Sequence, residues 1–510
     1  MTSVWGMARA SSVALLGVDA MIVEIEVWTG SGLPRTTMVG LPDAALAQAK
    51  ERCRAAVLSS GFSWPSQVLT INLTPASLPK TGSHYDLGIT AAVLATESII
   101  PVGALDEVIM LGEVGLDGAV HPVRGVLPAL LGARQLGITK AIVPASQLSE
   151  AELVSDMSVR GVRNLLELIV VLRGGQGSDA LPNPAPVVLD PQAPDLKDVI
   201  GLASARWALE VAAAGRHHLY FHGPPGVGKT LLASCLPSIL PDLSQDEALE
   251  VAAIHSLVDI SIPALPTRPS FSAPHHSASL ASLIGGGARI ARPGAISLAH
   301  RGVLFLDEAP EFPSPALEAL RTPLESGEIV LGRSEIAVRY PARFQLVLAA
   351  NPCPCGLAST PSSKCTCTPM AIRRYAGRLS GPILDRIDLK AQILPLRRSL
   401  VGFDPLEPES SQSVAERVQL ARNRQAARLQ DTPWLTNAEV PGRYLRKELP
   451  LPGGMELLER AQTSGGLSAR GLDKVLKIAW TIADLAGVGR PQRDHLAVAL
   501  GLRQGEECIG

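Results

Sequence analysis

The residues most able to do chemistry form the stretch GPPGVGKT, which lies between a strand-like run, HLYFH, and a helical pattern. Its members are Gly223, Pro224, Pro225, Gly226, Val227, Gly228, Lys229 and Thr230. Strand, glycine-rich loop and helix in this order form a phosphate-binding loop, whose backbone N–H groups surround phosphates. Lys229 would reach the β- and γ-phosphates, and the Thr230 hydroxyl would bind Mg²⁺. The stretch therefore predicts a site for ATP and magnesium, and a chance glycine-rich turn is the weaker alternative.

Three further polar residues stand at the ends of buried-looking apolar runs. Asp307 and Glu308 follow VLFL, and Asn351 follows FQLVLAA. Because α/β sheets bind ligands at the carboxyl ends of their strands, we expect all three beside the phosphate loop. Asp307 would hold Mg²⁺ through water, Glu308 would polarise the attacking water, and Asn351 would orient it. A solvated acidic turn and an ordinary turn asparagine are the alternatives.

A loop directly after Asn351 holds four of the seven cysteines: Cys353, Cys355, Cys365 and Cys367. In a reducing cytoplasm clustered cysteines favour a metal over disulfides. Four thiolates suit tetrahedral Zn²⁺, although paired C-x-C spacing is less common than C-x₂₋₄-C. We expect a structural zinc that orders the loop and fixes the segment leaving Asn351. Four merely reduced cysteines are the alternative.

The composition is that of a globular protein of several domains, with 510 residues, 46% of them apolar and 18% charged. The net charge of −2 gives no global basic signal, so contact with DNA would need a local patch or a pore. No run approaches the roughly eighteen uninterrupted apolar residues of a membrane helix. The N-terminal stretch shows no clear cleavage site. We expect a cytoplasmic protein without membrane contact.

The organisation along the chain predicts an α/β fold with a parallel-sheet core. Strand-like runs alternate with helical patterns on both sides of a Pro/Gly-rich linker, residues 176–195. We expect a first domain over 1–175, an ATPase core over 196–403, and a second linker with a helical C-terminal lid over 404–510.

The motifs around this site resemble those of AAA+ ATPases, with Asn351 in their sensor-1 position. "ESGEIVLGRSEIAVRYPARFQLVLAANP" and "SGPILDRIDL" resemble the branch that holds magnesium-chelatase motor subunits and MCM helicases. The resemblance implies that Arg386 is an arginine finger that enters the neighbouring subunit's site. It implies that Arg470 is the sensor-2 residue, which grips the γ-phosphate of its own chain. For Arg386 a surface salt bridge is the alternative.

The whole chain resembles the ComM/YifB group of magnesium chelatase-like ATPases. "GLPDAALAQAKERCRAAVLSSGF", "INLTPASLPKTGSHYDLGI", "APHHSASLASLIGGG" and "PGAISLAHRGVLFLDE" carry the match. Members are similar to hexameric DNA helicases, and ComM proteins drive branch migration in natural transformation. The resemblance thus implies a homohexameric ATP-driven motor on single-stranded or branched DNA. Leu202, Ala295 and Trp480 stand where the family usually has Gln, Glu and Arg.

The first domain resembles the Lon protease fold, especially in "LPKTGSHYDLGIT". Lon enzymes need a serine nucleophile activated by a lysine. His84 stands at the serine position and Leu127 at the lysine position, and a leucine cannot act as a base. The expected domain is therefore non-proteolytic, serving assembly or facing DNA.

The rival function is a chelatase-type remodeller that moves a protein partner without touching DNA. Two features favour DNA. The Lon-like domain is not expected in a chelatase motor subunit, and a predicted hairpin carries Arg333, Arg339 and Arg343, which could meet phosphates. A solvated basic hairpin is the alternative explanation for these arginines.

Overall fold

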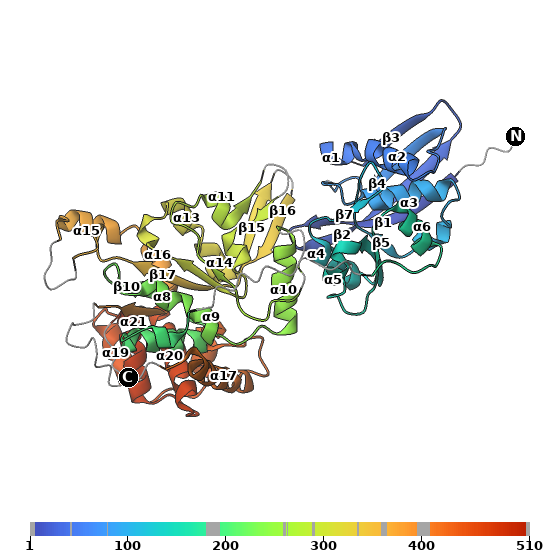
Figure 1. Ribbon diagram of the computed structural model, residues 1–510. Coiled ribbons are helices and arrows are strands. Elements are labelled where there is room, and N and C mark those ends of the chain that lie inside the picture. Colours follow the sequence, from blue (N-terminus) through green and yellow to red (C-terminus); the bar gives the residue numbers. More distant parts are fainter. Residues whose placement is uncertain are drawn as a thin grey trace.

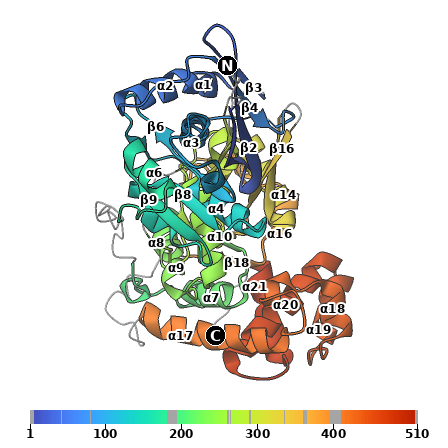
Figure 2. The ribbon, with the colours of Figure 1, turned by 90° about the vertical axis from the view of Figure 1, so that its right-hand side faces the viewer.

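The protein is described by a computed structural model, shown in Figures 1 and 2. It describes residues 6–40, 43–78, 80–179, 194–258, 262, 264–287, 291–333, 336–358, 365–394 and 409–505. For four of these residues only the backbone is described: Ala44, Ala45, Arg333 and Ile336. Two sheet-containing parts lie beside each other, the N-terminal one at the right of Figure 1.

The N-terminal part is a mixed sheet of seven strands in the order β3-β4-β2-β1-β5-β8-β9. The strands are β1 (Gly6–Leu16), β2 (Asp19–Gly30), β3 (Arg35–Val39), β4 (Val68–Thr74), β5 (Val108–Met110), β8 (Lys140–Pro144) and β9 (Ser158–Val162). β2 shows why a strand forms here: Val23, Ile25 and Val27 are fully buried on one face, and glutamates alternate with them.

Helices and a short ribbon complete this part. They are α1 (Ala44–Ala47), α2 (Ala49–Ser59), α3 (Asp86–Thr96), α4 (Val126–Gln135), α5 (Leu148–Ala151), α6 (Leu165–Leu172), β6 (Glu113–Val114) and β7 (Val120–His121). α3 is buried along nearly its whole length against β1 and β2.

The second part is built on five parallel strands in the order β11-β14-β17-β10-β18. They are β11 (Phe271–Ser272), β14 (Val303–Leu306), β17 (Gln345–Ala350), β10 (Leu219–His222) and β18 (Leu389–Gln392). Every residue of β14 and β17 is buried, as expected for strands covered on both faces.

The first helix of this part, α7 (Ala203–Gly215), precedes β10, and the other helices lie between the strands in sequence. They are α8 (Lys229–Ser234), α9 (Leu236–Ile239), α10 (Gln245–Ser256), α11 (Leu280–Ile284), α12 (Ala295–Leu298), α13 (Ser314–Glu318), α14 (Arg321–Ser326), α15 (Pro369–Ala376) and α16 (Gly381–Arg386).

The predicted hairpin is present and touches the N-terminal part. β15 (Glu328–Arg333) and β16 (Ile336–Pro341) pair antiparallel, and β12 (Gly285–Gly286) pairs with β13 (Arg292–Pro293) nearby. A single bridge joins Arg339 to Gly17 in the turn between β1 and β2. α10 packs on α4, so the hairpin and α10 form the seam between the two parts.

Five C-terminal helices pack beneath the second sheet, at the bottom of Figure 2. They are α17 (Ser411–Arg428), α18 (Gly442–Lys447), α19 (Glu456–Thr463), α20 (Ala469–Ala486) and α21 (Arg493–Gln504). One hydrophobic cluster runs from α7 and β10 into α17, α20 and α21. Trp480 lies inside it, 1% exposed, and the Arg428 guanidinium covers its ring at 4.4 Å. Trp480 replaces the arginine that is usual in the family, and the Arg428 guanidinium supplies a positive charge beside that position.

The predicted fold class is confirmed: an α/β protein with a parallel-sheet core and C-terminal helices. The domain boundaries remain a prediction, because most of the predicted linker, 180–193, and part of the second break, 401–408, lie outside the described residues. None of the helices within the described ranges is long and apolar enough to cross a membrane.

Candidate functional site

The glycine-rich stretch forms a loop between β10 and α8, and α8 begins at Lys229. Gly226 and Gly228 have φ of +75° and +88°, a region that side chains with a Cβ rarely adopt. These two glycines let the chain turn sharply into the helix, whose N-terminus carries free N–H groups and the positive end of the helix dipole. The loop therefore has the backbone form that binds phosphates.

Lys229 is only 7% exposed and is held by three oxygens. Its Nζ donates to the carbonyls of Gly223 and Pro224 at 2.7 and 2.8 Å and to Asn351 Oδ1 at 2.9 Å. Burial lowers the pKa of the Lys229 ammonium, and the carboxylates of Asp307 and Glu308 oppose that shift. Lys229 and Asn351, the predicted sensor residue, are therefore in direct contact.

The acidic pair lies beside the same loop, at the carboxyl end of β14. The Thr230 hydroxyl donates to Asp307 Oδ2 at 2.6 Å, and the Glu308 N–H donates to Asp307 Oδ1 at 2.9 Å. A hydroxyl and a carboxylate in contact are oxygen ligands of the kind Mg²⁺ takes with phosphates. The structure brings Lys229, Thr230, Asp307, Glu308 and Asn351 to one edge of the sheet.

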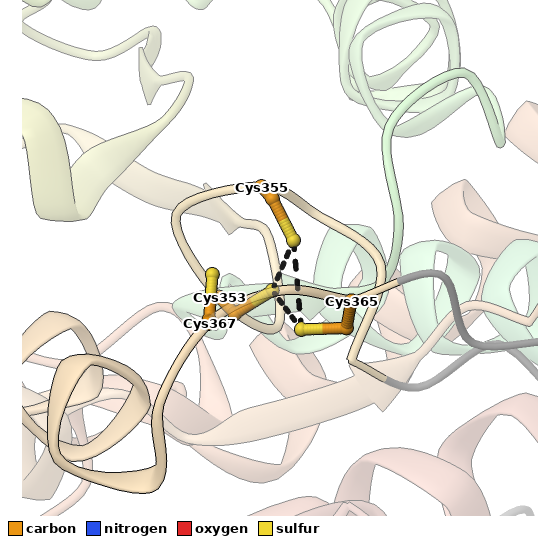
Figure 3. Close-up of side chains that lie close together, drawn as sticks. All are labelled: Cys353, Cys355, Cys365 and Cys367. Carbon is orange, nitrogen blue, oxygen red and sulfur yellow. Dashed lines mark hydrogen bonds between the residues drawn. The ribbon is translucent and has the colours of Figure 1, made fainter.

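The four loop cysteines also meet (Figure 3). All four sulfurs lie within 4.8 Å of one another. The Sγ of Cys353 is 3.3 Å from that of Cys355 and 3.7 Å from that of Cys365. Four thiolates about 2.3 Å from a tetrahedral Zn²⁺ would be about 3.8 Å apart, so the cluster fits this ion. The Leu357 N–H and then Cys353 lower the pKa of the Cys355 thiol to about 6.

The cysteine loop packs against the phosphate loop. A Cβ on Gly356 would lie 2.5 Å from Pro225 Cδ, and Gly356 has φ of +79°. The Gly356 N–H donates to the Cys353 carbonyl at 2.9 Å, which closes the turn around the first cysteine pair. The chain between Cys353 and Gly356 therefore contacts both the sulfur cluster and the predicted ATP site.

Arg386 lies elsewhere, at the end of α16. It is paired with Glu325, and its Nη1 donates to the Pro382 carbonyl at 2.7 Å. Arg386 and Glu325 line an open pocket of about 330 Å³ together with Glu318, Arg321 and Thr322. No sequence pattern marks Glu325 as the partner of Arg386, because the two residues are about sixty positions apart and meet only in the fold.

Arg470 lies on the same side as Arg386. Its Nη1 is 3.5 Å from Asp385 Oδ2, and Lys474, one turn further along α20, donates to the Arg386 carbonyl at 2.6 Å. Arg386 precedes β18, whereas the phosphate loop follows β10, and these strands run parallel from Leu219↔Leu389 to His222↔Gln392. Four strand residues span about 10 Å. Both arginines thus lie at the amino end of the sheet and the phosphate loop at its carboxyl end. This placement does not fit the prediction that Arg470 grips the γ-phosphate of its own chain.

A buried carboxylate, Asp388, organises this amino end. It accepts hydrogen bonds from the His218 N–H at 2.9 Å and from Lys474 Nζ at 2.8 Å. Burial alone would raise the pKa of Asp388, but the charge of Lys474 and the nearby His217 imidazole, whose Nδ1 lies 3.8 Å from Asp388 Oδ2, hold that pKa well below its usual range. Asp388 stands two residues after the "LDR" motif, and this short spacing to Arg386 is the sequence signal that could have found it.

The Lon-like position of the first domain holds no serine–lysine pair. His84 Nε2 faces the Val13 carbonyl at 2.9 Å, and burial lowers the pKa of His84 to about 4. Ser83 Oγ donates to Glu113 at 2.5 Å, and Leu127 is fully buried. A non-proteolytic role for this domain stays a prediction.

Another residue near the site was missed by motif reasoning. His276 Nδ1 lies 3.5 Å from Glu308 Oε2. The signal that could have found it is the pair of adjacent histidines in APHHSASL, two of the ten in the chain.

Three family models match successive parts of the chain. "Magnesium chelatase, subunit ChlI" matches residues 195–400, "Subunit ChlI of Mg-chelatase" matches 25–147, and "Magnesium chelatase, subunit ChlI C-terminal" matches 408–503. Because a chelatase-subunit model also matches the first region, that region alone does not separate a DNA motor from a chelatase-type remodeller.

Curated relatives extend over nearly the full length. An uncharacterized protein of Mycobacterium tuberculosis is 52% identical over 501 residues, covering 98% of this chain and 99% of the relative. Competence protein ComM of Haemophilus influenzae is 40% identical over 507 residues, 98% of this chain and 97% of its own. A Lon protease of Methanosarcina barkeri is 30% identical over 162 residues, 31% of this chain and 19% of its own.

The uncharacterized protein YifB of Escherichia coli is 42% identical over 493 residues, which cover 96% of each chain. Taken with the three family models and the identity to ComM, this shows that the chain belongs to the ComM/YifB family of magnesium chelatase-like AAA+ ATPases.

Proposed function

We propose that the protein is a homohexameric ring motor that uses ATP and Mg²⁺ to move along DNA, as a helicase or branch-migration factor. The observation that carries the ring is the separation of Arg386 and Arg470 from Lys229 at opposite ends of one sheet. A finger arginine placed there supports hydrolysis only in a neighbouring subunit. Each ATP site would then combine Lys229, Thr230, Asp307, Glu308 and Asn351 of one chain with Arg386 and Arg470 of the next.

DNA as the substrate is supported by the full-length similarity to a competence protein and by the hairpin. Arg343 is exposed at the base of β16. Arg339 is 61% exposed and pairs with Glu328 at 2.9 Å, an exposed contact that a phosphate can replace at little cost. The side chain of Arg333 lies outside the described residues.

DNA should stimulate the ATPase and bind in a salt-dependent way. Changing Arg333, Arg339 and Arg343 to Ala should flatten the dependence of affinity on salt, because each phosphate contact releases counterions. ATPase rates with and without single-stranded and branched DNA, and binding from low to high salt, measure both effects. A triple variant of exposed arginines outside the hairpin, Arg54, Arg163 and Arg460, is the control. An ATPase indifferent to DNA, with no salt-sensitive binding, would favour a remodeller of a protein partner.

The nucleotide roles are tested by two substitutions. Lys229→Ala should abolish ATP binding, since the phosphates lose their cation. Glu308→Gln should keep binding but hydrolyse slowly, trapping an assembled ring, because the amide cannot polarise water. Nucleotide binding, ATPase rate and size-exclusion mass distinguish them. Wild-type turnover by Glu308→Gln would contradict the role of Glu308.

The shared site is tested by mixing subunits. Arg386→Ala should bind nucleotide normally and lose roughly 10³–10⁵-fold in hydrolysis, the range of arginine fingers. Mixed with Lys229→Ala, it should recover part of the activity, because some interfaces then pair an intact Lys229 with an intact Arg386. We expect the same recovery for Arg470→Ala. No recovery in rings shown to be mixed would count against a shared site.

Zinc is expected in the cysteine cluster. Elemental analysis of untagged protein should find about one Zn²⁺ per chain, as four thiolates at these distances predict. Cys365→Ser with Cys367→Ser should lose the metal and lower both the melting temperature and the ATPase rate. Cys235→Ala, which removes a buried thiol outside the cluster, should keep the metal. Active protein without metal would exclude the zinc site.

A further inference from the structure

An open pocket of about 310 Å³ lies between strand β18 and the last two helices. β18 packs on α21, and α21 packs on α20, as Figure 2 shows. Lys390 stands at the beginning of β18, whereas the phosphate loop follows the end of the neighbouring strand β10. The pocket is therefore separate from the phosphate loop, at the amino end of the sheet. Its lining includes Lys390, Gly466, Ser468, Gly471, Arg503 and Gln504.

Two cations, Lys390 and Arg503, line this pocket. In the part of the chain that the structure describes, Lys390 is partly buried and its ammonium has no hydrogen bond or ion pair. Burial, and after it the positive charge of Arg503, lower the pKa of Lys390. Like charges this near each other disfavour one another, and an anion bound to both would remove that cost. The pocket therefore favours a negatively charged ligand.

The nearby carboxylates do not neutralise this positive charge. Arg503 Nη2 lies 3.7 Å from Asp385 Oδ1, and Arg470 Nη1 lies 3.5 Å from Asp385 Oδ2. Asp385 therefore serves two arginines. The other carboxylate nearby, Asp388, accepts a hydrogen bond from Lys474 Nζ at 2.8 Å. An excess of positive charge remains beside the pocket.

The first turn of α20 adds further groups that suit an anion. This helix has 18 residues, and its N-terminus carries the positive end of the helix dipole. The Ser468 hydroxyl accepts a hydrogen bond from the Gly471 N–H at 3.0 Å, which leaves its own proton to donate. A Cβ on Gly466 would lie 3.7 Å from Gln504 Nε2, so the absent side chain leaves room beside that amide. Cations, a hydroxyl and a helix N-terminus together are typical of phosphate sites.

We propose that this pocket binds a phosphate group, held by Lys390, Arg503 and the N-terminus of α20. The phosphate would belong to a free phosphate ester or to a DNA strand, since both present tetrahedral anionic oxygens. Because Arg503 also donates to the carbonyl of Ile387, next to Arg386, the bound phosphate would lie close to the predicted arginine finger. The site goes beyond the proposed function and does not rest on it.

Binding of inorganic pyrophosphate to the Lys229→Ala protein, without ATP, tests the proposal. This background disables the phosphate loop and leaves no nucleotide on a neighbouring chain. Titration calorimetry should find one saturable site per chain. Adding Lys390→Met, which keeps an unbranched side chain but removes the charge, should weaken binding by roughly tenfold or more, the effect of one lost charge-assisted contact. Lys140→Met, at an exposed lysine that begins β8 of the other sheet, should leave the affinity unchanged.

A second variant, Gly466→Leu, fills the pocket without changing a charge and should also weaken binding. Displacement of pyrophosphate by a short single-stranded oligonucleotide would assign the site to a DNA phosphate, and no displacement would assign it to a free phosphate ester. Both results support the site. No saturable binding overturns it, and so does binding that Lys390→Met and Gly466→Leu leave unchanged. A failure of the DNA-motor function would appear separately, as an ATPase indifferent to DNA.

Discussion

The burial of five parallel strands between two layers is the constraint on which the rest depends. Apolar side chains fill both faces of β14 and β17, so polar groups can stand only where strands begin or end. At the carboxyl end stand Lys229, Asp307 and Asn351, and at the amino end Arg386. The short strands keep the two sets about 10 Å or more apart. In the proposed ring, the two edges would belong to neighbouring copies and would together complete each phosphoryl-transfer site.

Each edge also has to satisfy the charges it buries. Lys229 uses two loop carbonyls and Asn351 in place of phosphate oxygens, so an entering nucleotide exchanges partners and does not have to desolvate a free ammonium. At the amino end Asp388 is the buried charge, and hydrogen bonds from Lys474 and from the His218 N–H compensate its burial. Because Lys474 also donates to the Arg386 carbonyl, Arg386 and helix α20 are both held beside Asp388.

Features that depend on residues near one another in sequence could be predicted, whereas contacts between residues far apart in sequence could not. The phosphate loop and the cysteine cluster are each formed by residues close together in sequence, so spacing alone predicted them. The acidic pair was expected beside the phosphate loop because ligands bind at the carboxyl ends of parallel strands, and the structure places it there. The strands of both sheets followed from alternating or continuous apolar runs. The side that Arg470 faces could not be predicted, because it depends on how α20 packs on α7 and on its contacts with Asp385 and Asp388, more than eighty residues earlier. Glu325 and His276 were missed for the same reason: their partners are remote in sequence, and a lone glutamate or histidine has no pattern.

The hydrophobic cluster that joins the second sheet to α17, α20 and α21 has a mechanical consequence. A swivel between sheet and C-terminal helices would expose side chains such as Val418, Val475 and Ile478 to water, at about 1.5–3 kcal/mol for each aliphatic side chain. The parallel sheet and the C-terminal helices therefore form one stiff body, which carries both the phosphate loop and Arg386. In the proposed ring, movement driven by ATP would displace this body as a whole relative to its neighbours, and the deformation would occur at the boundary between chains.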